Sequence, residues 1–154
     1  MTHLLHCPQM AGLAGRISDK RPDVQLGPVS WKAFQDALPG LVVEDAKSLR
    51  NRDMAFLASP DEPAEIFRPL ALVFEIPRLV VRSLTLVLPF FPVGSMERVD
   101  REGQGATASR RARMIRRTPF SLGGPTQIII FDTHARQERL GGHGPACPFS
   151  MAAA

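Results

Sequence analysis

The stretch QIIIFDTHARQ, residues 127–137, decides the fold. Its apolar residues follow a Gly-Gly-Pro turn at 123–125. A short apolar run bounded by turn residues is typical of a strand that is buried on both faces of a parallel sheet. In open α/β sheets, ligands bind outside the carboxyl ends of the strands. Asp132 and His134 come at the end of the run, so the pattern predicts that they lie at that edge of the sheet.

Asp132 and His134 are two positions apart, and such residues share a side wherever a strand continues through them. A carboxylate suits a hard cation that carries phosphate oxygens, and an imidazole can bind a metal or donate a hydrogen bond to phosphate. The alternative is a strand end with a solvated aspartate and a hydrogen-bonded histidine. Because D-x-H is a short and common pattern, the spacing alone favours that alternative.

The composition fits one folded domain with a mild positive charge. The chain has 154 residues, of which 44% are hydrophobic, enough for one core. The 19 Lys and Arg residues against 15 Asp and Glu residues give a net charge of +4, which suggests anionic ligands without implying nucleic acid. Cys7 and Cys147 lie near opposite ends without a zinc-ligand spacing, so no disulfide framework or structural metal is expected. The most apolar region, 79–93, is interrupted by an arginine and two prolines, so we expect no membrane span and a soluble, cytoplasmic protein.

Short apolar runs and helical spacings alternate along the chain. Strands are expected at 24–26, 54–58, 83–88 and 127–131, with a shorter one at 4–5. Helices are expected over 9–19, over about 61–75 with a kink or break at Pro69, and over 106–117. This alternation predicts an α/β fold with a mainly parallel sheet of about five strands and flanking helices.

Other segments are expected to be irregular. Pro39 and Gly40 indicate a turn between Leu38 and Val42, and Trp31 is predicted to be a core residue rather than a ligand contact. A glycine-containing stretch at 93–105 is expected to be a mobile loop. The domain is expected to span 1–140, followed by a disordered, low-complexity tail at 141–154.

Several segments resemble, in order, ribose-phosphate diphosphokinase, the enzyme that makes phosphoribosyl pyrophosphate. They are SLTLVLPFFP at 83–92, MERVD at 96–100, ATA at 106–108, GGP at 123–125 and FDTHARQER at 131–139. The resemblance covers roughly residues 3–140 and is closest to the plant-type branch of the family. It implies a type I phosphoribosyltransferase-like domain, the N-terminal one of the two that the family carries.

The family transfers the β,γ-diphosphoryl group of ATP to the C1 hydroxyl of ribose 5-phosphate with Mg²⁺, a step in nucleotide biosynthesis. The resemblance implies that this domain holds Mg-ATP, while the domain that binds ribose 5-phosphate is not represented. Diphosphoryl transfer depends mainly on positioning and electrostatic stabilisation, so we expect an incomplete catalyst and assign no catalytic residue. The implied partners are further copies of the chain, as a homo-oligomer, or a full-length synthetase.

Two motifs carry the implied nucleotide site. Asp132 and His134 match the family's D-x-H-A motif, which helps hold Mg-ATP, and this reverses the preference drawn from spacing alone. Phe34 and Asp36 match the F-x-D-G segment, which contacts adenine from a neighbouring subunit, although Ala37 replaces the glycine. A core aromatic beside a surface carboxylate is an equal alternative for this pair.

A loop in the family closes over the triphosphate, and 93–105 matches it. Arg98 and Arg101 lie in this stretch and could neutralise phosphate charge. Ser95 stands where the better-known branch has an arginine that contacts ATP.

The arginine-rich stretch 110–117 suggests a function of a different class, a phosphate-binding surface for RNA or DNA. No aromatic stacking residues or nucleic-acid motif accompany these arginines. A solvated helix face is therefore the preferred interpretation, and nucleic acid is not the expected partner.

Overall fold

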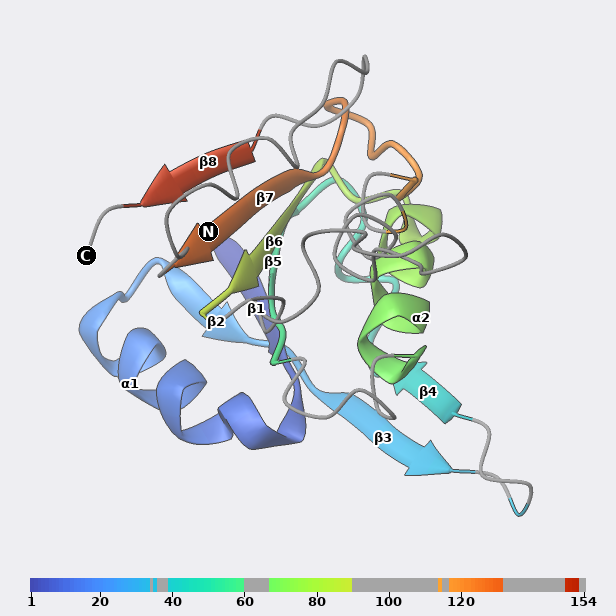
Figure 1. Ribbon diagram of the computed structural model, residues 1–154, viewed down its shortest axis with the longest axis horizontal. Helices are drawn as coiled ribbons and strands as arrows, with labels where there is room; N and C mark the ends of the chain where they lie inside the picture. The colour runs from blue at the N-terminus through green and yellow to red at the C-terminus, as the bar shows by residue number, and fades with distance from the viewer. Residues whose placement is uncertain are drawn as a thin grey trace, which may run out of the picture.

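A computed structural model describes residues 1–33, 35, 39–59, 67–89, 114, 117–131 and 149–152. Its main element is a six-stranded parallel sheet with the order β2-β1-β5-β6-β7-β8 (Figure 1). The strands are β1 (Thr2–His6), β2 (Val24–Leu26), β5 (Asp53–Leu57), β6 (Ser83–Leu88), β7 (Gln127–Phe131) and β8 (Phe149–Ala152). The predicted α/β fold with a mainly parallel sheet is confirmed.

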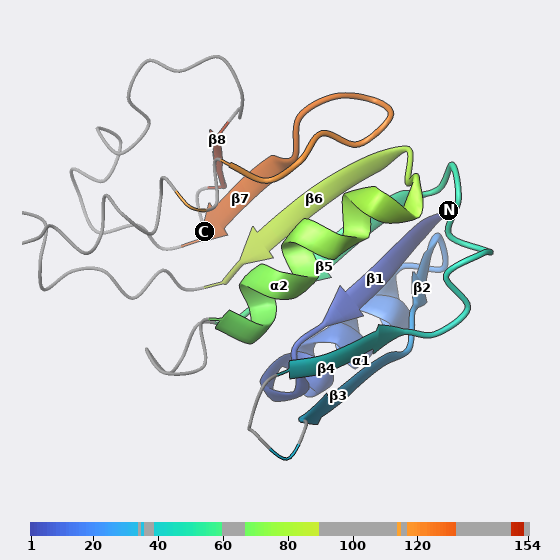
Figure 2. The same cartoon turned by 90° about the vertical axis from the view of Figure 1, so that its right-hand side faces the viewer.

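In the described part of the chain, two helices cover opposite faces of this sheet (Figure 2). A short 3-10 turn, η1 (Pro8–Met10), leads into α1 (Ala11–Lys20), which connects β1 to β2. Helix α2 (Phe67–Glu75) continues into a second 3-10 turn, η3 (Ile76–Leu79), and precedes β6. The chain moves from β1 to β2 in one direction along the sheet and from β5 to β6 in the other. Right-handed crossovers therefore place α1 and α2 on opposite faces.

Of the helix expected over about 61–75, the structure describes Phe67–Glu75 as α2, and 61–66 lie outside the described residues, so the expected kink or break at Pro69 stays a prediction. Pro69 is the third residue of α2, which continues to Glu75. The first-turn N–H groups of a helix have no intrahelical acceptor, so a proline there removes no helical hydrogen bond.

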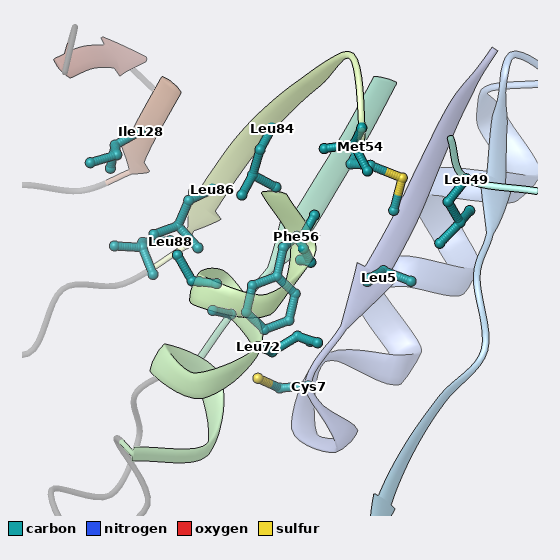
Figure 3. Close-up of a cluster of buried hydrophobic side chains, with 14 of the residues drawn as sticks. Leu5, Cys7, Leu49, Met54, Phe56, Leu72, Leu84, Leu86, Leu88 and Ile128 are labelled. Atoms are coloured by element: carbon teal, nitrogen blue, oxygen red, sulfur yellow. The ribbon is translucent and has the colours of Figure 1, made fainter. Parts of the chain in front are cut away.

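The parallel register aligns side chains in rows across the sheet. One row faces α2 and is buried: Leu5, Phe56, Leu86 and Ile128. Figure 3 shows these side chains in one cluster with Leu72 of α2. On the opposite face, Leu4 and Leu57 pack with Ala14 of α1. Because side chains alternate between the two faces of a strand, the apolar runs of β1 and β5 serve both cores.

A separate antiparallel hairpin joins β3 (Val29–Ala33) to β4 (Pro39–Val43), and the turn predicted at Pro39 and Gly40 is wrong. These two residues begin β4, where Pro39 pairs with Ala33 and Gly40 with Lys32. A proline is tolerated at the first residue of a strand, where the ladder does not need its missing N–H.

Trp31 of β3 is partly buried, and its ring lies 6.3 Å from that of Phe56 at an interplanar angle of 22°. The hairpin thus contributes to the core on the α2 side, and the prediction that Trp31 is a core residue is confirmed.

The segment 149–152 differs from the expected disordered tail, because it forms β8 in parallel with β7. Strand pairing uses backbone N–H and C=O groups, so a segment without side-chain periodicity can still complete the edge of a sheet. The predicted loop at 93–105, most of the predicted helix at 106–117 and the rest of the tail lie outside the described residues. Within the described part of the chain, no helix is long and apolar enough to cross a membrane.

Candidate nucleotide site at the carboxyl edge of the sheet

The carboxyl ends of the parallel strands form one edge, toward which the arrowheads point in Figure 2. β5 ends at Leu57, β6 at Leu88 and β7 at Phe131. Backbone hydrogen bonds continue the ladder one residue beyond β1 and β5: Cys7 N donates to Leu57 O at 3.0 Å, and Ala58 N donates to Val87 O at 3.0 Å. Backbone hydrogen bonds therefore fix this edge up to the last residues of the strands.

Two polar side chains on this edge belong to the described residues. Ser59, which follows β5, is buried with 7% of its surface exposed. His6, the last residue of β1, is partly buried, and its Nδ1 lies 2.9 Å from Cys7 O. Because a carbonyl can only accept, Nδ1–H is the donor in this contact. The sequence predicts no function for His6 or Ser59. The one feature in the sequence that marks them is a position at or just after the end of a strand.

The six residues assigned from the sequence lie outside the described residues: Phe34, Asp36, Arg98, Arg101, Asp132 and His134. The structure gives the strand that leads to the D-x-H-A motif, since Asp132 directly follows Phe131, but gives no geometry among the six side chains. Among the residues that it describes, no group of three or more His, Cys, Asp or Glu gathers as a metal site.

A carboxyl group with a lowered pKa, that of Asp53, lies at the opposite, amino edge of the sheet, where the strands begin. Arg82 Nε donates to Asp53 Oδ1 at 2.7 Å, Arg82 Nη2 pairs with Oδ2, and Ser83 Oγ donates to Oδ1 at 2.6 Å. These bonds, first from Arg82 and then from Ser83, hold the pKa of Asp53 well below its usual range. Because this cluster joins the first residues of β5 and β6, far from the carboxyl edge, we assign it a structural role.

The parallel sheet and its two helix layers define an α/β domain of the type I phosphoribosyltransferase-like class. A solved structure shares this fold: phosphoribosylpyrophosphate synthetase from Mycobacterium smegmatis, with a TM-score of 0.76 and 17% identity over 99% of this chain and 48% of that one. No family model matches the chain.

The sequence is similar to plant proteins. It is 43% identical over 137 residues to ribose-phosphate pyrophosphokinase 3, chloroplastic, of Oryza sativa subsp. japonica, covering 89% of this chain and 34% of that protein. It is 44% identical over 138 residues to ribose-phosphate pyrophosphokinase 4 of Arabidopsis thaliana, covering 90% of this chain and 41% of that protein. The predicted resemblance to ribose-phosphate diphosphokinase is confirmed. The chain spans about a third to two-fifths of the length of these relatives.

Proposed function

We propose that the chain binds Mg-ATP at the carboxyl edge of its sheet, as the ATP-holding part of a ribose-phosphate diphosphokinase. One observation carries the proposal. β7 is an inner strand, paired on both sides, and it ends at Phe131, directly before the D-x-H-A motif at 132–135. Ligands of open parallel sheets bind outside such strand ends. The identity with plant ribose-phosphate pyrophosphokinases supports the same site.

The proposed donor set fits Mg²⁺ with a triphosphate. Mg²⁺ takes oxygen ligands, keeps several waters, and is commonly held by one or two carboxylates together with substrate phosphates. Asp132 would supply the carboxylate, and His134 would bind the metal or donate to a phosphate oxygen. Mg²⁺ held there would neutralise the charge of the phosphate oxygens. Arg98 and Arg101 would add positive charge beside the same oxygens.

Adenine is assigned to Phe34 and Asp36, which follow β3 in the sequence. In the proposed assembly this segment reaches the nucleotide of a neighbouring subunit. That role requires further copies of the chain, as a homo-oligomer, or association with a full-length synthetase.

The reaction proposed for the whole assembly is ATP plus ribose 5-phosphate giving phosphoribosyl pyrophosphate and AMP, for nucleotide biosynthesis. On this proposal the present residues hold ATP, and residues outside these 154 orient the acceptor hydroxyl of ribose 5-phosphate. Orientation supplies much of the catalysis in such transfers, so we expect negligible synthesis by the isolated chain. The cytoplasm is the proposed compartment; an organelle is the alternative, since the rice relative's name says chloroplastic.

A second candidate function is that of a non-catalytic subunit that binds a full-length synthetase. Co-purification with a full-length synthetase from the source cells, together with loss of nucleotide binding in the isolated chain, would favour it. Nucleic-acid binding through Arg110–Arg117 is less favoured. Of these arginines only Arg117 is described, and it is exposed.

The test is calorimetric titration of the full chain with ATP, with and without Mg²⁺. We expect Mg-dependent binding that His134→Ala abolishes and that His3→Ala, at the amino end of β1, leaves unchanged. Circular dichroism checks that each variant is folded. Unchanged Mg-ATP binding in His134→Ala would contradict the assignment of that residue, and the absence of binding in the wild type would contradict the proposed function.

A further inference from the structure

The edge of the sheet opposite the candidate nucleotide site carries a cluster of exposed apolar and basic residues. Three segments meet there: the turn 44–50 that precedes β5, the end of η3 with Val80, and the segment 120–122 that precedes β7. Figure 2 shows them on the side where the strands begin and the N-terminus lies. We call these residues the amino-edge surface.

Three large apolar side chains of this surface face solvent. Val80 is 46% exposed, Phe120 is 60% exposed and Leu122 is 62% exposed. The backbone of two of them is held by hydrogen bonds: Leu122 N donates to Val81 O at 3.1 Å, and Val80 O accepts from Asn51 N at 2.9 Å. Apolar groups that are held in water on a rigid backbone are typical of interaction surfaces.

Val80 is also strained. Its φ of 61° lies in the left-handed region, which is a genuine outlier for a β-branched residue. Strain of this kind persists where the surrounding structure imposes it, and it is enriched at functional sites. Here it holds an exposed apolar side chain in the lining of a pocket rather than in the core.

The pocket beside Val80 has a volume of about 120 Å³. Its apolar lining comes from Ala46, Leu79 and Val80, and its charged lining from Lys47, Arg50 and Arg78. No acidic residue of the described part of the chain lines it. Arg78 is in contact with Glu75 at 3.3 Å on the open surface. Lys47 and Arg50 form no ion pair with another described residue.

The size and the charge of the pocket select the occupant. Pockets for nucleotides and other small ligands are roughly 300–1,000 Å³, so this one is too small for them. It is large enough for one acidic side chain, and its basic residues complement a carboxylate. Val80, Phe120 and Leu122 give a bound segment apolar contacts in addition to the ion pair, which a single bound ion would not use.

We propose that the amino-edge surface docks a short acidic and apolar segment of a partner protein. A carboxylate of the partner enters the pocket between Lys47, Arg50 and Arg78, and apolar partner residues cover Val80, Leu122 and Phe120. This surface is separate from the carboxyl edge, so a partner bound here leaves the proposed nucleotide site open.

The test is selection of a random twelve-residue peptide library displayed on phage against the full chain. We expect enriched peptides that combine Asp or Glu with apolar residues. Synthetic copies of them are expected to bind at least tenfold more weakly to Arg50→Gln and to Leu122→Ser. The matched controls are Arg16→Gln, on the exposed side of α1, and Val42→Ser, on the exposed side of β4. All four positions are exposed, so the variants should remain folded.

Several results would overturn the proposal. These are no enriched peptide, enriched peptides without acidic residues, or equal binding by Leu122→Ser. Arg50-dependent binding of inorganic phosphate without any peptide binding would make the pocket an ion site. Glu44 and Asp45 lie in the same turn as Lys47 and Arg50, so a second copy of this chain also carries carboxylates that fit the pocket. Sedimentation velocity tests this self-association. Self-association that Leu122→Ser removes would make the face a contact between copies of this chain. Mg-ATP titration, measured separately, tests the proposed function independently.

Discussion

Phe56→Ala tests the core that fixes the sheet edges in place. Phe56 has 0% of its surface exposed, belongs to the buried row on the α2 side, and contacts the ring of Trp31 in the hairpin. Removing a buried phenylalanine ring costs about 3–5 kcal/mol, because transfer energy is lost and a cavity remains. A domain of ordinary stability has about 5–15 kcal/mol in total, so the variant should remain only marginally folded.

Urea denaturation followed by circular dichroism measures this loss. With a slope of about 2 kcal/mol per M, a loss of about 4 kcal/mol lowers the midpoint by about 2 M. Val42→Ala is the control, since Val42 is 55% exposed and its truncation should change the free energy of unfolding by no more than about 0.5 kcal/mol. If Phe56→Ala does not fold, Phe56→Leu should give a smaller loss of about 1–2 kcal/mol. A loss below about 1 kcal/mol in Phe56→Ala would refute the burial argument.

Two further predictions concern the amino edge. Gly123→Ala should lower the thermal midpoint by several degrees relative to Gly12→Ala, because a Cβ at Gly123 would lie 2.7 Å from Arg82 O whereas Gly12 has open space; equal midpoints would contradict the close approach. Asp53→Asn should make the loss of stability below about pH 4 shallower, since the depressed folded pKa of Asp53 gives stability that is present above its unfolded pKa of about 3.9 and is lost as the pH falls. The measurement is urea denaturation at successive pH values. If the free energy of unfolding falls as steeply in Asp53→Asn as in the wild type, the Asp53–Arg82 pair does not supply this stability.

Much of the sheet follows from local sequence. The runs at 24–26, 83–88 and 127–131 form β2, β6 and β7 with the predicted bounds, because an apolar run between turn residues has few other ways to be buried. Local sequence does not predict the hairpin, because Pro39 and Gly40 are strong turn residues. Their place at the start of β4 depends on pairing with β3, which no local pattern encodes.

The candidate site was predictable only as a location. Parallel pairing is what brings the carboxyl ends of β5, β6 and β7 to one edge, and the alternation of strands and helices already implied it. The side chains assigned to ATP, from Phe34 to His134, come from segments that connect the strands. Their positions depend on tertiary contacts and on ligand, so sequence periodicity says nothing about them.

The most direct test of the central claim is NMR of the labelled chain with Mn²⁺-ATP, a paramagnetic substitute for Mg²⁺-ATP. Strand β5 is about 17 Å long, because a strand rises about 3.3 Å per residue, so the two edges lie at clearly different distances from the proposed metal. We predict strong broadening of the amide signals of Ala58, Ser59 and Phe131, and much weaker broadening of those of Gly123 and Gly124 at the opposite edge. Asp132→Asn should remove the broadening. Broadening centred on Gly123 and Gly124, or equal broadening in Asp132→Asn, would contradict a metal-nucleotide site at the carboxyl edge.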